Sequence, residues 1–295
     1  MKATHLTAVT PLKNSQYWLL AIAAGLVAIY MTLTWKAGDT AQLGMSVLFW
    51  LAVASSLWGK RHSLKLESGV LPSFLGALLI ALILWQGATI SGLALTNETV
   101  QAKAPFLRFI PFFSALGVGL LASGFKGLKQ YWQEITILFF LGIPSVVLSS
   151  LTDISPVTAK FSAFLLWYSG FQVSLQDVYI NLPTGSVKVY GGCSGVEAMT
   201  YLLGLAVICL VMFPIQGRKQ IFVPIVALII GFIVNAMRVS LMAVLIAFSN
   251  KEAFDYWHEG EGSLIFGMIS VFIFGLFYLF LLRQEEPEDH DTREF

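Results

Sequence analysis

Long apolar runs separated by short polar stretches dominate this chain. Eight of the runs are close to the length of about 20 residues that an α-helix needs to cross the hydrocarbon core of a bilayer. We therefore predict an all-α polytopic membrane protein with about eight transmembrane helices. The predicted spans are residues 16–35, 42–59, 70–90, 105–123, 135–152, 194–213, 221–248 and 263–282.

One connection is longer than the others and has a different pattern. Residues 153–193 begin with an apolar stretch, SPVTAKFSAFLLWYSG, which we interpret as a short interfacial or re-entrant helix. The stretches FQVSLQDVYINLP and GSVKVYGG then alternate apolar and polar residues, and Pro183, Thr184 and Gly185 between them give a turn signal. The pattern predicts a small extracytoplasmic β-hairpin directly before the sixth span.

Composition supports the membrane class and excludes others. The chain is 57% hydrophobic and 12% charged, with a mean hydropathy of +0.76, whereas a soluble domain carries roughly 25% charged residues. We therefore expect the lipid bilayer as a partner, and the net charge of +1 gives no indication of nucleic acid. The two cysteines, Cys193 and Cys209, form no CxxC pair, so we predict no metal, no cofactor and no disulfide framework.

The basic residues predict the orientation. With a cytoplasmic N-terminus, eleven Lys and Arg residues fall inside and five outside, in agreement with the positive-inside rule. We therefore expect a multi-pass membrane protein with both termini in the cytoplasm. Residues 153–193 and 249–262 then lie together on the outer face.

The predicted organisation is a single integral membrane domain over residues 1–295. No internal repeat of the kind found in many transporters is evident. The parts of the domain are five N-terminal spans within 1–152, an extracytoplasmic segment at 153–193, a catalytic three-span core at 194–282 and a cytoplasmic tail at 283–295.

Cys193 occupies an unusual position for a cysteine that merely packs. Ser194 and Glu197 fit the S-x-x-E capping box, which predicts a helix that begins near Ser194. Cys193 would then precede a helix N-terminus, where the helix dipole favours a thiolate. Glycines on both sides, Gly195 among them, would let a substrate backbone approach closely. The alternative is a small buried residue, which is our interpretation of Cys209.

Arg238 places a guanidinium inside an apolar run, at a cost of about 2.5–3.5 kcal/mol on insertion scales. Asn235 lies three residues earlier and so on the same helical face. One interpretation is a structural ion pair with Glu197, and the other is an oxyanion or carboxylate clamp beside Cys193. Arg238 lies about ten residues, or ~15 Å, before the predicted outer end of its span. Either the span ends earlier, or Arg238 lines a cleft.

His258 is the histidine that falls on the predicted outer face. Together with Cys193 and Arg238 it would complete a set for nucleophilic acyl transfer, with a thiol, a base and a cation. Asp255, Glu259 and Glu261 are candidates for orienting its ring, and the sequence leaves the choice open.

Arg108 lies close to the outer end of its own span. Its long side chain fits either snorkelling to the interface or a role in substrate binding.

Three sequence blocks around these residues resemble the signature blocks of the exosortase/archaeosortase family. They are GGCSGVEAMTYLL, NAMRVSLMAVL and HEGEGSLIFG, which follow the family's order within residues 191–267. The resemblance is closest to the cyanobacterial branch, the cyanoexosortases. Where the family pattern has an alanine before the cysteine, this chain has Gly192, and the pair after the motif is Val196 and the acidic Glu197.

The resemblance implies a membrane-embedded, transpeptidase-like cysteine protease. Its substrates would be secreted proteins with a C-terminal sorting signal of the PEP-CTERM kind, made of a short motif, a transmembrane helix and a basic cluster. The enzyme would lie in a bacterial inner (plasma) membrane, with its active site facing the periplasm. Cleavage would occur at this outer face through a thioacyl intermediate on Cys193, with Arg238 and His258 as its catalytic partners. We assign substrate-binding or supporting roles to Ser194, Gly195, Glu197, Asn235 and Arg108.

Other classes of protein remain open from the sequence. An anion-binding transporter would use Arg238 and Arg108, a thiol oxidoreductase would need a second cysteine near Cys193, and a non-catalytic component of a secretion assembly would leave Cys193 without a role. Hydrolysis and transpeptidation share the thioacyl step, so the sequence does not separate them.

Overall fold

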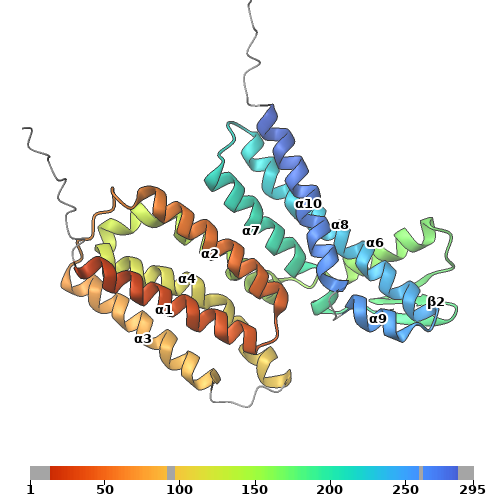
Figure 1. Cartoon of the computed structure of the whole chain (residues 1–295). Helices are drawn as coiled ribbons and strands as arrows, with labels where there is room; N and C mark the ends of the chain where they lie inside the picture. The colour runs from red at the N-terminus through yellow and green to blue at the C-terminus, as the bar shows by residue number, and fades with distance from the viewer. Residues whose placement is uncertain (1–13, 92–96, 259–261, 285–295) are drawn as a thin grey trace, which may run out of the picture. The chain divides into compact units, whose positions relative to one another are not determined.

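The computed structural model describes residues 14–91, 97–258 and 262–284 (Figure 1). Within them, every predicted span coincides with a helix, which confirms the all-α polytopic class. The helices are α1 (Asn14–Lys36), α2 (Thr40–Lys60), α3 (Val70–Ser91), α4 (Asn97–Gly127), α5 (Trp132–Leu151), α6 (Ser155–Tyr168), α7 (Val196–Met212), α8 (Lys219–Ala247), α9 (Lys251–His258) and α10 (Gly262–Arg283), with short 3₁₀ turns η1 (Leu128–Tyr131) and η2 (Gly191–Cys193).

Among the described residues, six helical segments are long and apolar enough to cross a membrane. One of them, Pro105–Leu151, has 47 residues and joins parts of α4 and α5, which is about twice what one crossing needs. Gly124, with φ of 64°, breaks the helix there, and η1 follows. α7 is a shorter apolar helix of 17 residues, at the lower limit for a span. The count of eight spans stays a prediction.

The β structure differs from the predicted hairpin. Residues 174–188 form a three-stranded antiparallel sheet in the order β1 (Ser174–Gln176), β2 (Tyr179–Leu182) and β3 (Gly185–Lys188). The predicted turn at 183–185 joins β2 to β3, but a second turn divides the first predicted strand. Asp177 adopts φ of 56° there, a conformation that Asp tolerates better than most residues. β1 therefore folds back on β2.

The chain divides into two compact units. Unit 1 comprises residues 1–43 and 60–135, and unit 2 comprises residues 44–59 and 136–295. Unit 1 contains α1, α3 and α4, and within it the buried Glu134 carboxylate forms an ion pair with Lys60 at 2.7 Å. The single-domain organisation, with its boundaries at 152, 193 and 282, stays a prediction, and the tail beyond residue 284 lies outside the described residues.

In unit 2, one apolar cluster joins α6, the sheet and α8. Ile180 and Leu182 of the sheet pack between these helices, and Cys193 lies against the cluster as a partly buried neighbour. α9 and the sheet both contact α8 (Figure 1). The buried members of the cluster are Ala159, Ala163, Leu166, Ile180, Leu182, Val189, Val239 and Ala243.

The packing of α7 on α8 depends on Gly231. A Cβ atom there would lie 2.9 Å from the Cα of Met199 and 3.1 Å from the carbonyl oxygen of Ala198. Small residues at such a crossing let two helix backbones approach closely. Because the obstructing atoms belong to the backbone of α7, a larger side chain would separate the two helices.

We therefore expect Gly231→Leu to destabilise the protein by about 1–3 kcal/mol or more, as overpacking does. Thermal unfolding in detergent, followed by size-exclusion chromatography, measures the change. Gly267→Leu is the matched control, because a Cβ at Gly267 meets nothing within 4 Å. Equal unfolding midpoints for the two variants would contradict this account of the helix crossing.

Candidate active site

Cys193, His258 and Arg238 come together in unit 2, although three separate elements carry them. Cys193 ends η2, His258 ends α9 and Arg238 lies within α8. The Cys193 Sγ atom is 3.4 Å from His258 Nε2. Arg238 Nη2 donates a hydrogen bond to the main-chain carbonyl of His258 at 2.6 Å. The arrangement places a thiol beside an imidazole. It also places a guanidinium against the main-chain carbonyl of the residue that carries this imidazole.

The cysteine sits on a tight turn just before α7. Its N–H donates to the carbonyl of Tyr190 at 2.8 Å, and the next N–H, that of Ser194, donates to Gly191 at 3.3 Å. Gly195 then adopts φ of 95°, where a side chain is strained. A Cβ on Gly195 would also lie 2.7 Å from the side-chain amide of Asn235. Gly195 is therefore required by both its backbone conformation and its surroundings.

The predicted capping box is wrong, although Cys193 does precede the helix as expected. α7 begins at Val196 with Gly195 as its N-cap. The Ser194 hydroxyl donates instead to the carbonyl of Gly191 at 2.7 Å, and the Glu197 carboxylate accepts from Tyr201 at 2.8 Å. The positive φ at Gly195 turns the chain between Ser194 and the helix. As a result only the N–H of Val196 approaches the Ser194 oxygen, at 3.5 Å.

Asn235 lies beside the cysteine, as its place on the face of Arg238 predicted. Its Nδ2 donates to the main-chain carbonyl of Cys193 at 2.9 Å, and the residue is buried. α8 therefore contacts both partners of the thiol–imidazole pair. Asn235 binds the main chain of Cys193, which carries the thiol, and Arg238 binds the main chain of His258, which carries the imidazole.

The ring of His258 is held by stacking within α9. Phe254 lies one helical turn earlier, and the two ring centroids are 5.0 Å apart with planes 14° from parallel. Residues four apart share a helix face, so α9 itself supplies this contact. Of the acids proposed to orient the ring, Asp255 is exposed, whereas Glu259 and Glu261 lie outside the described residues.

Arg238 has a different partner from the one that sequence reasoning considered. Among the described residues it forms no ion pair with Glu197, and its hydrogen bond goes to a carbonyl at the C-terminal end of α9. Carbonyls at a helix C-terminus lack partners in the helix and carry partial negative charge, so a cation is stabilising there. The Nε atom of Arg238 is buried and has no hydrogen-bond acceptor in the described part of the chain.

Two residues that sequence reasoning did not select also support the site. Thr158 Oγ1 donates to the carbonyl of Ser194 at 2.6 Å, and Ser162 Oγ donates to that of Ala236 at 3.0 Å. Both residues lie on α6 and both are fully buried. The signal was present in the sequence, because Ser155, Thr158 and Ser162 recur at intervals of three and four residues in an apolar helix, which places them on one face.

Arg108 belongs to unit 1 and has a partner there. Its Nη2 lies 3.4 Å from the Asp39 carboxylate, which is partly exposed to solvent. Such an ion pair contributes little to stability. The role of Arg108 in substrate binding stays a prediction.

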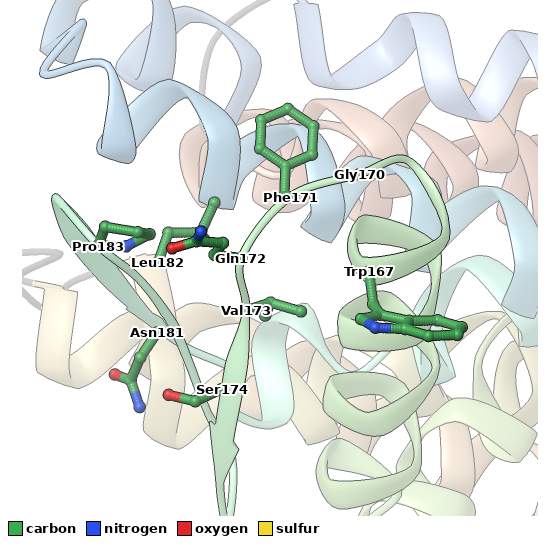
Figure 2. Close-up of a pocket in the computed structure, with 9 residues that line it drawn as sticks. All are labelled: Trp167, Gly170, Phe171, Gln172, Val173, Ser174, Asn181, Leu182 and Pro183. Atoms are coloured by element: carbon green, nitrogen blue, oxygen red, sulfur yellow. The ribbon is translucent and has the colours of Figure 1, made fainter.

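Unit 2 also has an open cleft at the end of α6. Its volume is about 580 Å³, and Figure 2 shows the chain turning at Gly170 after α6 and continuing past Val173 to Ser174, where β1 begins. The cleft is separate from the thiol–imidazole pair, since its lining includes none of Cys193, Arg238 and His258. The lining residues are Trp167, Gly170, Phe171, Gln172, Val173, Ser174, Asn181, Leu182 and Pro183.

Fold and site together define a multi-pass membrane protein with a thiol–imidazole pair supported by an arginine. The family model for "Transmembrane exosortase (Exosortase_EpsH)" matches residues 35–275, a range that includes Cys193, Arg238 and His258. The chain therefore belongs to the transmembrane exosortase family, whose members are cysteine-type transpeptidases, and the resemblance inferred from the sequence blocks is confirmed at that level. No curated protein and no solved structure gives a significant match. The closer likeness to cyanoexosortases stays a prediction.

The contact between Cys193 and His258 makes a prediction about thiol reactivity. His258→Ala should slow alkylation of Cys193 by a maleimide at pH 7 about tenfold or more, because an unassisted thiol is only a few per cent thiolate at that pH. Peptide mass spectrometry resolves the two cysteines, so Cys209 serves as the internal control. His62→Ala, which removes a histidine of unit 1, should leave the alkylation rate of Cys193 unchanged. An unaltered rate in His258→Ala would show that the imidazole does not assist the thiol.

Proposed function

We propose that this chain is a membrane-embedded cysteine transpeptidase that cleaves C-terminal sorting signals of the PEP-CTERM kind from secreted proteins. The observation that carries the proposal is the 3.4 Å contact between Cys193 Sγ and His258 Nε2, in a chain of the transmembrane exosortase family. Nucleophilic catalysis needs such a pair, since the thiolate is the attacking form.

The reaction follows from this pair. His258 accepts the proton of the Cys193 thiol, and the sulfur attacks the carbonyl carbon of the scissile peptide bond. The tetrahedral intermediate collapses as His258 returns the proton to the leaving amine, which gives a thioacyl enzyme and releases the C-terminal fragment. An acceptor amine or water then attacks the thioacyl carbonyl, and the thiol is regenerated.

Arg238 has two tasks in this proposal. Nη2 holds the C-terminal end of α9, and so His258, through the 2.6 Å bond to the His258 carbonyl. We assign to the positive charge of the guanidinium the stabilisation of the oxygen of the tetrahedral intermediate, because preorganised charge stabilises developing charge strongly.

The length of α8 supports a site at a membrane surface. The helix has 29 residues, or about 43 Å, whereas about 20 residues cross the hydrocarbon core. Counted from Lys219, 20 residues end at Arg238, and the rest of α8 would extend beyond the core. Arg238 would then lie at the boundary, which removes the difficulty with its depth. With the orientation predicted from the basic residues, this boundary is the periplasmic face of the inner membrane.

A site at that boundary suits a substrate whose cleavage point lies next to its own transmembrane helix. The substrate helix would share the bilayer with the enzyme while the motif beside it reaches Cys193. Transporter and assembly functions leave the thiol–imidazole contact without a role, so no observation favours them over the enzyme.

The test is co-expression with a secreted protein that carries a PEP-CTERM-type signal. Cys193→Ala should abolish processing, with a loss of at least about 10³-fold because the nucleophile is gone. A size shift on a blot measures processing, and the mass of the new C-terminus distinguishes transfer to an acceptor from hydrolysis. Cys209→Ala is the matched control and should process normally. Normal processing by Cys193→Ala at equal expression would refute the assignment of the nucleophile.

A further inference from the structure

Two successive carbonyls at the nucleophile are each bound by a side chain from a different helix. The carbonyl of Cys193 accepts from Asn235 Nδ2 of α8 at 2.9 Å. The carbonyl of Ser194 accepts from Thr158 Oγ1 of α6 at 2.6 Å. Thr158 is 0% exposed and Asn235 is 4% exposed. Water therefore does not compete freely for these two bonds.

Side chains make these bonds because the local backbone does not form a regular helix. Gly195, with φ of 95°, separates Ser194 from α7. The carbonyl of Gly195 is the first to accept from the helix, from the N–H of Met199 at 2.9 Å. The two carbonyls before it lie outside α7, and buried backbone carbonyls need a donor. Thr158 and Asn235 supply donors at these points.

The helices that carry the two donors are also bound to each other. Ser162, one turn after Thr158, donates to the carbonyl of Ala236 at 3.0 Å. The Ser240 hydroxyl of α8 lies 2.9 Å from the carbonyl of Ala236 on its own helix and 3.2 Å from that of Ser162, so its single hydrogen is shared between the two carbonyls. The distance between the two donors is thus set by a direct connection between α6 and α8, and the turn that carries the thiol is fixed against both helices.

We infer that Thr158 is a positioning residue for the nucleophile, acting with Asn235 as a clamp on the carbonyls of Ser194 and Cys193. The clamp keeps the Cys193 sulfur within reach of His258, which α8 holds through Arg238. α6 is then part of the catalytic apparatus and not only a connection between a span and the sheet. The inference rests on the proposed role of Cys193 as the nucleophile.

The test compares three variants of α6 in the full-length protein. Thr158→Val keeps the shape and removes the donor, and Thr158→Ser keeps the donor. Ser155→Ala is the matched control, since it removes a buried hydroxyl of the same helix that binds neither the cysteine turn nor α8. The readouts are the pH profile of Cys193 alkylation, with Cys209 alkylation as a check of the fold, and kcat and KM for processing of a PEP-CTERM-type substrate.

Thr158→Val should shift the alkylation profile of Cys193 towards that of an unassisted thiol. It should also lower kcat on the order of tenfold, the size expected for one lost hydrogen bond, with little change in KM. Thr158→Ser and Ser155→Ala should keep the wild-type profile and rate. Wild-type behaviour of Thr158→Val would overturn the inference, and so would an equal loss in Ser155→Ala.

The experiments distinguish a failure of the proposed function from a failure of the positioning role of Thr158. Alkylation needs no substrate, so it reports on the clamp even if the wild-type chain processes no sorting signal. In that case the proposed function would fall, while a shifted profile in Thr158→Val would still support the positioning role. Asn235→Leu provides an independent check, because leucine has a similar volume, adds no charge and cannot donate to the Cys193 carbonyl, and it should shift the profile in the same direction.

Discussion

A guanidinium on an apolar helix must find a hydrogen-bond acceptor, and in this chain Arg238 finds it at the C-terminal end of α9. The bond to the His258 carbonyl at 2.6 Å requires α9 to fold back along α8. It thereby brings the imidazole to the level of Asn235 and Arg238 on that helix. The placement of the thiol–imidazole pair depends on this one interaction, because His258 is the last residue of a helix only eight residues long.

The other half of the pair depends on packing and not on charge. The turn that carries Cys193 follows the sheet and lies against the apolar cluster of α6, the sheet and α8. A sheet of three short strands is stable only if it can bury an apolar face, and here that face packs with residues of α6 and α8. By burying Ile180 and Leu182, the sheet fixes the direction from which the chain enters the cysteine turn. α8 is common to both halves, since it packs against the sheet and also binds α9.

This arrangement explains how one helix can both cross a membrane and carry residues of the proposed catalytic site. The part of α8 before Asn235 is almost entirely apolar, as a span requires, and its polar residues are concentrated where the cysteine and the histidine meet. Burial strengthens the hydrogen bonds there because water is excluded. It also makes each unmet donor or acceptor costly, and for this reason Thr158 and Asn235 matter beyond the carbonyls they bind.

The sequence by itself determined the class of the protein and the apolar helices that coincide with its predicted spans, and it singled out the cysteine, the histidine and the arginine that the structure brings together. Hydropathy is a local property of the chain, and a cysteine, a histidine and an arginine are rare enough in such a chain to be noticed. Only the tertiary structure decided the partner of Arg238, the role of Gly195 in place of a capping box, and the contact of Thr158 with Ser194. It also decided the third strand, through the turn at Asp177. These features depend on hydrogen bonds and close contacts between segments that are far apart in the sequence. A local pattern of residues does not specify which of those segments come into contact.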